Sequence, residues 1–327
     1  MDYVSRFQVA RGDRVQCLLC PHLCLLASGQ RGRCGGRENR TGQLISTNYG
    51  RVAALALDPI EKKPLYHFYP GTRILSLGPQ GCNLRCLFCQ NWQISQQETT
   101  TERTTPQDIV AMAQGMPGCI GLAFTYSEPL IWYDFVLDTA SLAKEAGLKN
   151  VLVTNGFVNK GPLQELLAVV DGVNLDVKAF SNSFYEKYCG ARLAPVLENA
   201  QLIAQRCHLE LTYLIIPGLN DADGEITDFC RWVATALGRA TPVHFTRYFP
   251  RYKLTIPPTP LSSLRRARRI GESLLDYVYL GNVGEEFPTH CPRCGGVVVE
   301  RQNYQVQSRL VHGRCPDCGQ AVARVES

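Results

Sequence analysis

The chain has 327 residues, of which 45% are hydrophobic, and a formal net charge of +5 at pH 7. This length suffices for one large core with small appended segments. The absence of an apolar run long enough for a signal peptide or a membrane span predicts a cytoplasmic protein. The mild charge permits a nucleic-acid partner but does not require one. Fifteen cysteines in such a chain indicate metal or cluster binding rather than disulfides.

Residues 1–50 form a glycine- and arginine-rich N-terminal segment with four cysteines spaced C-x2-C-x3-C-x9-C. Four thiolates can close the coordination sphere of one zinc ion, for which His22 is a spare ligand, or hold an auxiliary iron–sulfur cluster. The sequence leaves both alternatives open, with zinc preferred. The predicted ligands are Cys17, Cys20, Cys24 and Cys34.

Residues 51–283 are predicted to form the main domain, because short β-branched runs alternate there with amphipathic stretches. Six βα units in series indicate a parallel sheet. The predicted strands are residues 74–77, 120–125, 151–154, 173–177, 209–216 and 243–248, and the predicted helices are 106–114, 131–146, 162–169, 195–206, 221–237 and 261–275.

The fourth predicted strand separates polar from apolar side chains: Asn174, Asp176 and Lys178 share one face. A doubly wound sheet buries both faces in apolar helices, so a polar face instead indicates a curved sheet around a polar cavity. Six units are too few to close an eight-stranded barrel. We therefore expect an α/β fold of the partial (β/α)6 barrel type.

Three cysteines with C-x3-C-x2-C spacing, Cys82, Cys86 and Cys89, follow the first predicted strand. A [4Fe–4S] cluster normally takes four thiolates, so a loop with three leaves one iron open for a small molecule. An open coordination position is typical of a catalytic site, as it is for zinc, whereas structural sites are closed. A distant fourth cysteine is the alternative.

Polar side chains also follow the next three strands, at the edge where barrel active sites lie. They are Ser127 and Glu128, then Asn155, then Asp176 and Lys178. Each alone is consistent with a surface loop, and Asp176 with Lys178 is consistent with an internal salt bridge. Their joint position predicts one site.

Residues 284–327 carry two Cys-Pro-x-Cys-Gly sequences, with Cys291 and Cys294 in the first and Cys315 and Cys318 in the second. This pattern is typical of a closed tetrahedral S4 site that folds a small segment. We expect a zinc-ribbon-like module, with a rubredoxin-like iron site as the alternative.

The Cys82 loop, including the aromatic Phe88, resembles the cluster loop of the radical S-adenosylmethionine (SAM) superfamily. Residues 61–68 and 124–129 resemble the branch related to pyruvate formate-lyase activating enzymes. The cysteine-bearing ends make the chain most similar to the radical SAM enzymes of the AmmeMemoRadiSam system.

The resemblance implies the partial barrel of the superfamily and roles for individual residues. Glu128 would take the SAM ammonium group and Lys178 its carboxylate, while Asn155 lies where the ribose is contacted. Tyr126 and Ser127 replace two glycines of the family. Asp176 is retained from a monovalent-cation site whose other aspartate is Val153 here, so that site is expected to be weakened or absent.

The implied activity is reductive cleavage of SAM to a 5′-deoxyadenosyl radical that abstracts hydrogen from an unidentified substrate. It would require anaerobic conditions and a flavodoxin- or ferredoxin-type electron donor. Memo-like and AMMECR-like proteins are implied as possible partners. The alternatives are an activating enzyme that installs a glycyl radical on a partner protein, and an RNA-modifying or RNA-binding protein, which the mild charge disfavours.

Overall fold

A computed structural model describes residues 3–284, 287–302 and 304–323. Residues 1–2 of the predicted N-terminal segment, and residues 285–286, 303 and 324–327 of the predicted C-terminal module, lie outside the described residues. None of the described helices is long and apolar enough to cross a membrane.

An eight-stranded sheet forms the centre of the molecule, with the strand order β16-β15-β14-β13-β12-β11-β9-β8. Neighbours from β9 to β16 pair in parallel, and β8 pairs antiparallel to β9. The strands are β8 (Ala54–Pro59), β9 (Arg73–Gly78), β11 (Cys119–Phe124), β12 (Lys149–Thr154), β13 (Gly172–Asp176), β14 (His208–Ile215), β15 (Val243–Arg247) and β16 (Val278–Gly281).

The six predicted strands match β9 and β11 to β15, so the α/β fold with a parallel sheet is confirmed. The two outermost strands were not predicted. In β8 the run Ala54 to Leu57 consists of good helix formers, and Leu55 is exposed at the sheet edge, so the strand lacks a clear buried face. Strand β16 has only four residues, which gives too short a pattern.

Helices follow the strands in the predicted alternation, and α2 illustrates why they begin where they do. Thr105 and Asp108 form a reciprocal capping box at its N-terminus, with Pro106 at the first helical position. The helices are η1 (Ile60–Lys62), α1 (Trp92–Ser95), α2 (Pro106–Gly115), η2 (Pro129–Trp132), α3 (Tyr133–Glu145), α4 (Lys160–Leu166), α5 (Asn182–Phe184), the π-helical turn η3 (Tyr185–Cys189), α6 (Ala194–Ala204), α7 (Asp223–Ala236) and α8 (Leu261–Leu274).

The polar face of β13 turns toward side chains of neighbouring strands rather than toward a helix. Asn174 accepts a hydrogen bond from Thr212 Oγ1 (2.9 Å) and donates one to Pro64 O (2.7 Å). Asp176 and Thr212 pair in register across β13 and β14 and line the same pocket. The inner surface of the sheet is therefore polar at its carboxyl edge, as the alternation predicted.

The N-terminal strands are small antiparallel ribbons that pack on the barrel. They are β1 (Tyr3–Val4), β2 (Gln8–Arg11), β3 (Arg14–Cys17), β4 (Leu25–Leu26), β5 (Arg37–Arg40), β6 (Gln43–Ser46) and β7 (Arg51–Val52), which pairs with β10 (Glu102–Arg103). Val15, Leu19 and Leu44 belong to the same hydrophobic cluster as the barrel core. Arg37 of β5 forms a buried salt bridge with Asp134 of α3 (2.8 Å). The segment thus shares its core with the barrel.

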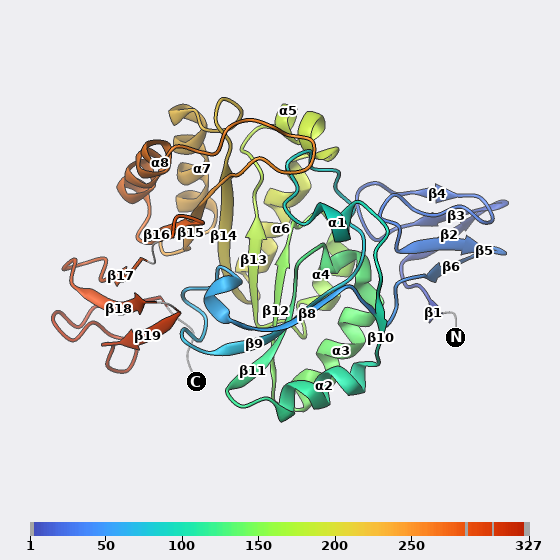
Figure 1. The fold of residues 1–327 in the computed structure, drawn as a ribbon, viewed down its shortest axis with the longest axis horizontal. Helices are drawn as coiled ribbons and strands as arrows, with labels where there is room; N and C mark the ends of the chain where they lie inside the picture. The colour runs from blue at the N-terminus through green and yellow to red at the C-terminus, as the bar shows by residue number, and fades with distance from the viewer. Residues whose placement is uncertain (1–2, 285–286, 303, 324–327) are drawn as a thin grey trace.

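The C-terminal strands β17 (Thr289–His290), β18 (Val297–Gln302) and β19 (Gln305–Ser308) form a separate three-stranded sheet with its own small core. Tyr277 and Tyr279 join this core from β16 and the residues just before it. Figure 1 shows β1–β6 and β17–β19 at opposite ends of the molecule, with the central sheet between them.

Candidate active site and metal centres

Two glycines allow the cysteine loop after β9 to lie close against neighbouring backbone. A Cβ atom on Gly78 would stand 2.3 Å from Thr125 O, and one on Gly81 would stand 2.4 Å from Cys34 O. Gly81 also has φ +101°, a region in which larger residues are strained. The loop therefore lies between the end of β11 and the N-terminal segment.

Hydrogen-bond donors surround the sulfur atoms of this loop. Leu84 N lies 3.3 Å and Asn155 Nδ2 3.6 Å from Cys82 Sγ, and Ser95 Oγ lies 3.1 Å from Cys89 Sγ. Burial raises the pKa of the Cys82 thiol well above its usual range. Burial thus favours the neutral thiols, whereas the neighbouring donors favour the thiolates that ligate iron.

All nine residues predicted for the catalytic and cofactor site line one pocket of about 270 Å³. They come from the ends of four consecutive strands, β9, β11, β12 and β13. Cys189 contacts Cys86, but no fourth cysteine of the described chain lines the pocket. The nine residues are Cys82, Cys86, Phe88, Cys89, Ser127, Glu128, Asn155, Asp176 and Lys178.

Glu128 is a buried carboxylate that neighbouring strand ends hold in place. It accepts hydrogen bonds from Thr154 Oγ1 (2.6 Å), Asn155 N (2.8 Å) and Leu130 N (3.0 Å). Burial raises the pKa of Glu128 to about 7, in spite of these donors. The carboxylate is thus fixed in position and can bind a cation most strongly above neutral pH.

Lys178 and Asp176 form a salt bridge of 2.8 Å within the pocket lining. Although burial opposes it, the charge of Asp176 raises the pKa of Lys178. The internal salt bridge that the sequence allowed is therefore present. It does not exclude a ligand role, because both side chains also face the pocket.

Tyr126 adopts a left-handed conformation, with φ +67°, a backbone region that favours glycine. Its hydroxyl donates to Asp58 Oδ2 (2.7 Å), Lys63 Nζ lies 4.6 Å from its ring centre, and Asn91 Nδ2 donates to its carbonyl (2.6 Å). These contacts offset backbone strain that costs about 1–2 kcal/mol.

The pocket also contains residues that the sequence analysis did not select. Thr212 of β14 and Thr246 of β15 extend the inner face of the sheet, Ser95 is the last residue of α1, and Gln96 caps that helix. The two threonines follow the same inward alternation as Asp176, so strand periodicity was the available signal. No pattern in the sequence around Ser95 predicted its contact with Cys89, because that contact depends on how the loop folds.

A second, larger cleft of about 1040 Å³ lies between the barrel and the C-terminal module. Glu300, Arg301 and Gln302 of β18 line one side, and His244 of β15 lines another. This cleft and the pocket share three lining residues, Pro64, Thr246 and Asn282. The two spaces are therefore adjacent at the carboxyl edge of the sheet.

The C-terminal cysteines are gathered into a ligand set for one metal ion. Their four sulfur atoms all lie within 4.8 Å of one another, and the Cys291–Cys318 and Cys294–Cys315 pairs are 3.5 Å and 3.6 Å apart. This arrangement fits metal binding by the four thiolates.

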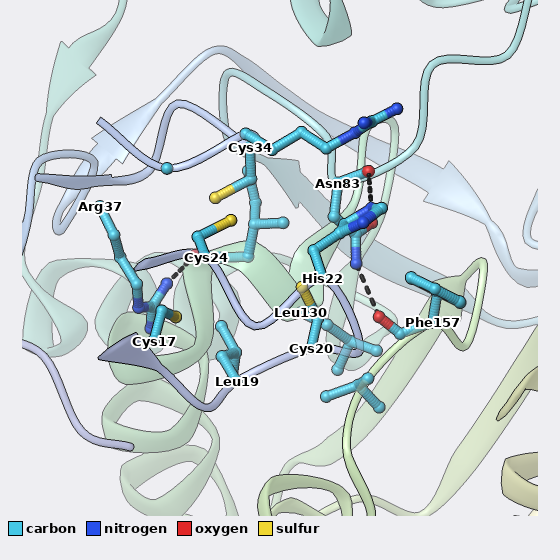
Figure 2. Close-up of a pocket in the computed structure, with 14 residues that line it drawn as sticks. Cys17, Leu19, Cys20, His22, Cys24, Cys34, Arg37, Asn83, Leu130 and Phe157 are labelled. Carbon is cyan, nitrogen blue, oxygen red and sulfur yellow. Dashed lines mark hydrogen bonds between the residues drawn. The ribbon is translucent and has the colours of Figure 1, made fainter. Parts of the chain in front are cut away.

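The N-terminal cysteines surround a third, smaller pocket (Figure 2), which Asn83 of the Cys82 loop also lines. His22 Nε2 donates to Asn83 O (2.9 Å) rather than pointing to a cysteine sulfur. The structure therefore brings all four predicted N-terminal ligands to one place, beside the cluster loop.

Residues 78–230 match the profile of the Radical SAM superfamily. The chain is 43% identical over 325 residues to an uncharacterized protein of Methanocaldococcus jannaschii, with 95% of each chain covered. It is 29% identical over 161 residues to the pyruvate formate-lyase 1-activating enzyme of Escherichia coli, which spans 47% of this chain and 65% of that relative.

Two solved structures share the fold at low sequence identity. SuiB of Streptococcus suis bound to the precursor peptide SuiA has a TM-score of 0.51 and 13% identity, covering 65% of this chain and 48% of that chain. A radical SAM methyltransferase from Sphaerobacter thermophilus has a TM-score of 0.51 and 14% identity, covering 65% of this chain and 67% of that chain.

Proposed function

Because the chain belongs to the radical SAM superfamily of enzymes, we propose that Cys82, Cys86 and Cys89 hold a [4Fe–4S] cluster whose open iron binds SAM. The observation that carries the proposal is one pocket that is lined by these three thiols and by the six residues predicted to bind the cofactor. When bound, the cluster and SAM supply a 5′-deoxyadenosyl radical that abstracts hydrogen.

The residues of this chain bind and orient SAM. Glu128, fixed by Thr154, Asn155 and Leu130, offers a carboxylate to the SAM ammonium group. Lys178 offers an ammonium group to the SAM carboxylate, and Asp176 holds Lys178 in place. Opposite charges on the two sides of one pocket fix the direction in which an amino acid group binds.

The cleft beside β18 is proposed as the path of the substrate. It is contiguous with the pocket through Pro64, Thr246 and Asn282. Its volume of about 1040 Å³ lies at the upper end of the range for small-molecule sites. A bulky substrate or a segment of a protein would therefore fit, and the identity of the substrate stays open.

The metal of the C-terminal quartet is proposed to be zinc. Four thiolates with no open position form a closed structural site, for which zinc is the usual ion. The site would fold β17–β19, whose core contains few residues.

A glycyl-radical-installing activity on a partner protein is the second candidate, favoured by the similarity to the activating enzyme of Escherichia coli. An RNA-directed activity is less well supported, because Arg266 and Arg268 of α8 pair with Asp223 (2.6 Å) and Glu272 (2.7 Å). A flavodoxin- or ferredoxin-type donor and Memo-like or AMMECR-like proteins remain the proposed partners.

The test compares the anaerobically reconstituted wild type with the Cys82→Ala/Cys86→Ala/Cys89→Ala variant. After addition of SAM and dithionite, 5′-deoxyadenosine is measured by chromatography. The wild type should form it and the variant should not. A matched control, Cys119→Ala/Cys207→Ala/Cys230→Ala, removes three cysteines that do not line the pocket and should retain the activity. Product formation by the triple loop variant would exclude the assigned ligands.

A further inference from the structure

The four N-terminal cysteines come from three places along the chain and meet at one pocket (Figure 2). Cys17 ends β3, Cys20 and Cys24 lie in the turn between β3 and β4, and Cys34 precedes β5. Apolar side chains such as Leu19, Leu130 and Phe157 form much of the remaining wall. Four thiols facing one largely apolar pocket form a site for a thiolate-bound inorganic group.

The spacing of the sulfurs separates this site from the C-terminal one. Around a single ion bound at about 2.3 Å, four sulfurs must lie close together, as they do at the C-terminus. Across residues 3–284, 287–302 and 304–323, no other three such ligands are gathered into a set for one ion. Neither the Cys82 loop nor the N-terminal quartet forms such a set, and a cluster does not require one, because its thiolates bind different irons.

The buried side chain of Arg37 is a second, independent observation that points to a ligand in the pocket. Its Nη1 and Nη2 atoms donate to Ile131 O (2.7 Å) and Asp134 Oδ2 (2.8 Å). Its Nε–H is buried and has no hydrogen-bond partner, although the side chain lines the pocket and only 1% of the residue is exposed. A buried donor without an acceptor is costly, and a cluster sulfur would supply the acceptor.

We propose that Cys17, Cys20, Cys24 and Cys34 bind a second iron–sulfur cluster, closed by four thiolates, that passes single electrons to the Cys82 loop. The assignment of the cluster does not depend on the proposed function, whereas the electron-relay role rests on it. One electron from a protein donor of the flavodoxin or ferredoxin class reduces the N-terminal cluster. Transfer of that electron to the loop cluster returns the N-terminal cluster to its oxidised form.

A short chain of contacts joins the two sites. The backbone N–H of His22 donates to the Cys20 sulfur, and the imidazole Nε2 donates to Asn83 O (2.9 Å). Asn83 directly follows Cys82 in the chain, and Asn155 Nδ2 donates to both Asn83 Oδ1 (2.9 Å) and Cys82 Sγ (3.6 Å). The two sites are therefore connected through His22 and Asn83, and His22 is a positioning residue between them.

The first experiment measures iron, sulfide and zinc in the anaerobically purified Cys82→Ala/Cys86→Ala/Cys89→Ala variant. This variant should retain about four iron and four sulfide ions per chain. After reduction it should give a paramagnetic signal that SAM does not change, since no iron is open. Adding Cys20→Ala/Cys24→Ala should remove that iron. A second zinc ion in place of the iron would overturn the proposal, whether or not the wild type cleaves SAM.

The second experiment tests the relay with His22→Phe, which keeps an aromatic ring near Phe157 (ring centres 5.1 Å apart in the wild type). Iron content should stay unchanged, while SAM cleavage driven by reduced flavodoxin should slow by about tenfold or more. Cleavage driven by dithionite, which can reduce the loop cluster directly, should change little. His312→Phe, an exposed histidine, is the control. Equal slowing with both reductants would place His22 in the catalytic pocket instead and overturn the relay.

Discussion

Glu128 and Tyr126 lie in the segment after β11, and contacts with neighbouring residues hold both side chains in place. The buried carboxylate of Glu128 accepts three hydrogen bonds. These bonds oppose the effect of burial, which raises its pKa. Tyr126 has a left-handed backbone conformation that favours glycine, and Asp58 and Lys63 hold its side chain. Both arrangements maintain the geometry of one loop, the segment after β11.

The pKa of Glu128, about 7, gives a pH dependence with a defined sign. Below that value the carboxyl group is neutral, and above it the carboxylate can pair with the SAM ammonium group. The affinity for SAM should therefore increase as the pH rises from 6 to 8, by up to about tenfold per pH unit below the pKa. Isothermal titration across this range checks the prediction.

Glu128→Gln should bind SAM more weakly at pH 8 and lose this part of the pH dependence. Glu145→Gln, which alters an exposed carboxylate at the end of α3, is the matched control and should behave as the wild type. A pH profile shared by all three proteins would mean that Glu128 has a structural role alone.

At the scale of elements, the sequence predicted what depends on local periodicity. Six strands and the shared edge of their polar ends followed from alternation and from the parallel βα order, and Asp176 and Asn155 line the pocket at that edge. The edge strand β8 and the hydrogen bonds to Glu128 were not predictable, because both depend on partners distant in the chain. The contribution of Ser95 was missed for the same reason.

Removal of the C-terminal metal should unfold one element and leave the rest. Cys294→Ser/Cys318→Ser removes two of the four thiolates, and the small core around Val298 and Val299 cannot hold β18 without them. Hydrogen exchange should become fast in β18 and remain slow in β13, and bound zinc should fall by about one per chain. Slow exchange retained in β18 after loss of the metal would show that the module folds without it.

At the scale of the whole molecule, the two cysteine-rich ends have different relations to the barrel. The C-terminal sheet has its own core, whereas the N-terminal ribbons share the barrel core and contact the Cys82 loop. The sequence divided the chain at residues 50 and 283. In the structure, the residues on the two sides of the boundary at residue 50 contribute to one hydrophobic core.

Arg37→Met should therefore destabilise the whole chain rather than the N-terminal segment alone. The substitution leaves Asp134, fully buried in α3, without its cationic partner, which typically costs about 3–5 kcal/mol. A single unfolding transition at lower denaturant concentration is the expected result. Arg37→Met/Asp134→Leu should recover part of the loss, since no buried charge remains, and a variant with two separate transitions would contradict the shared core.

The most direct test of the central claim is electron-nuclear double resonance on the reduced protein with SAM that carries nitrogen-15 in its amino group. A hyperfine coupling between the loop cluster and this nitrogen is expected, because the iron that Cys82, Cys86 and Cys89 leave open is the one proposed to bind SAM. The coupling should be absent from the Cys82→Ala/Cys86→Ala/Cys89→Ala variant. A reduced wild-type cluster that binds SAM without any such coupling would contradict the account.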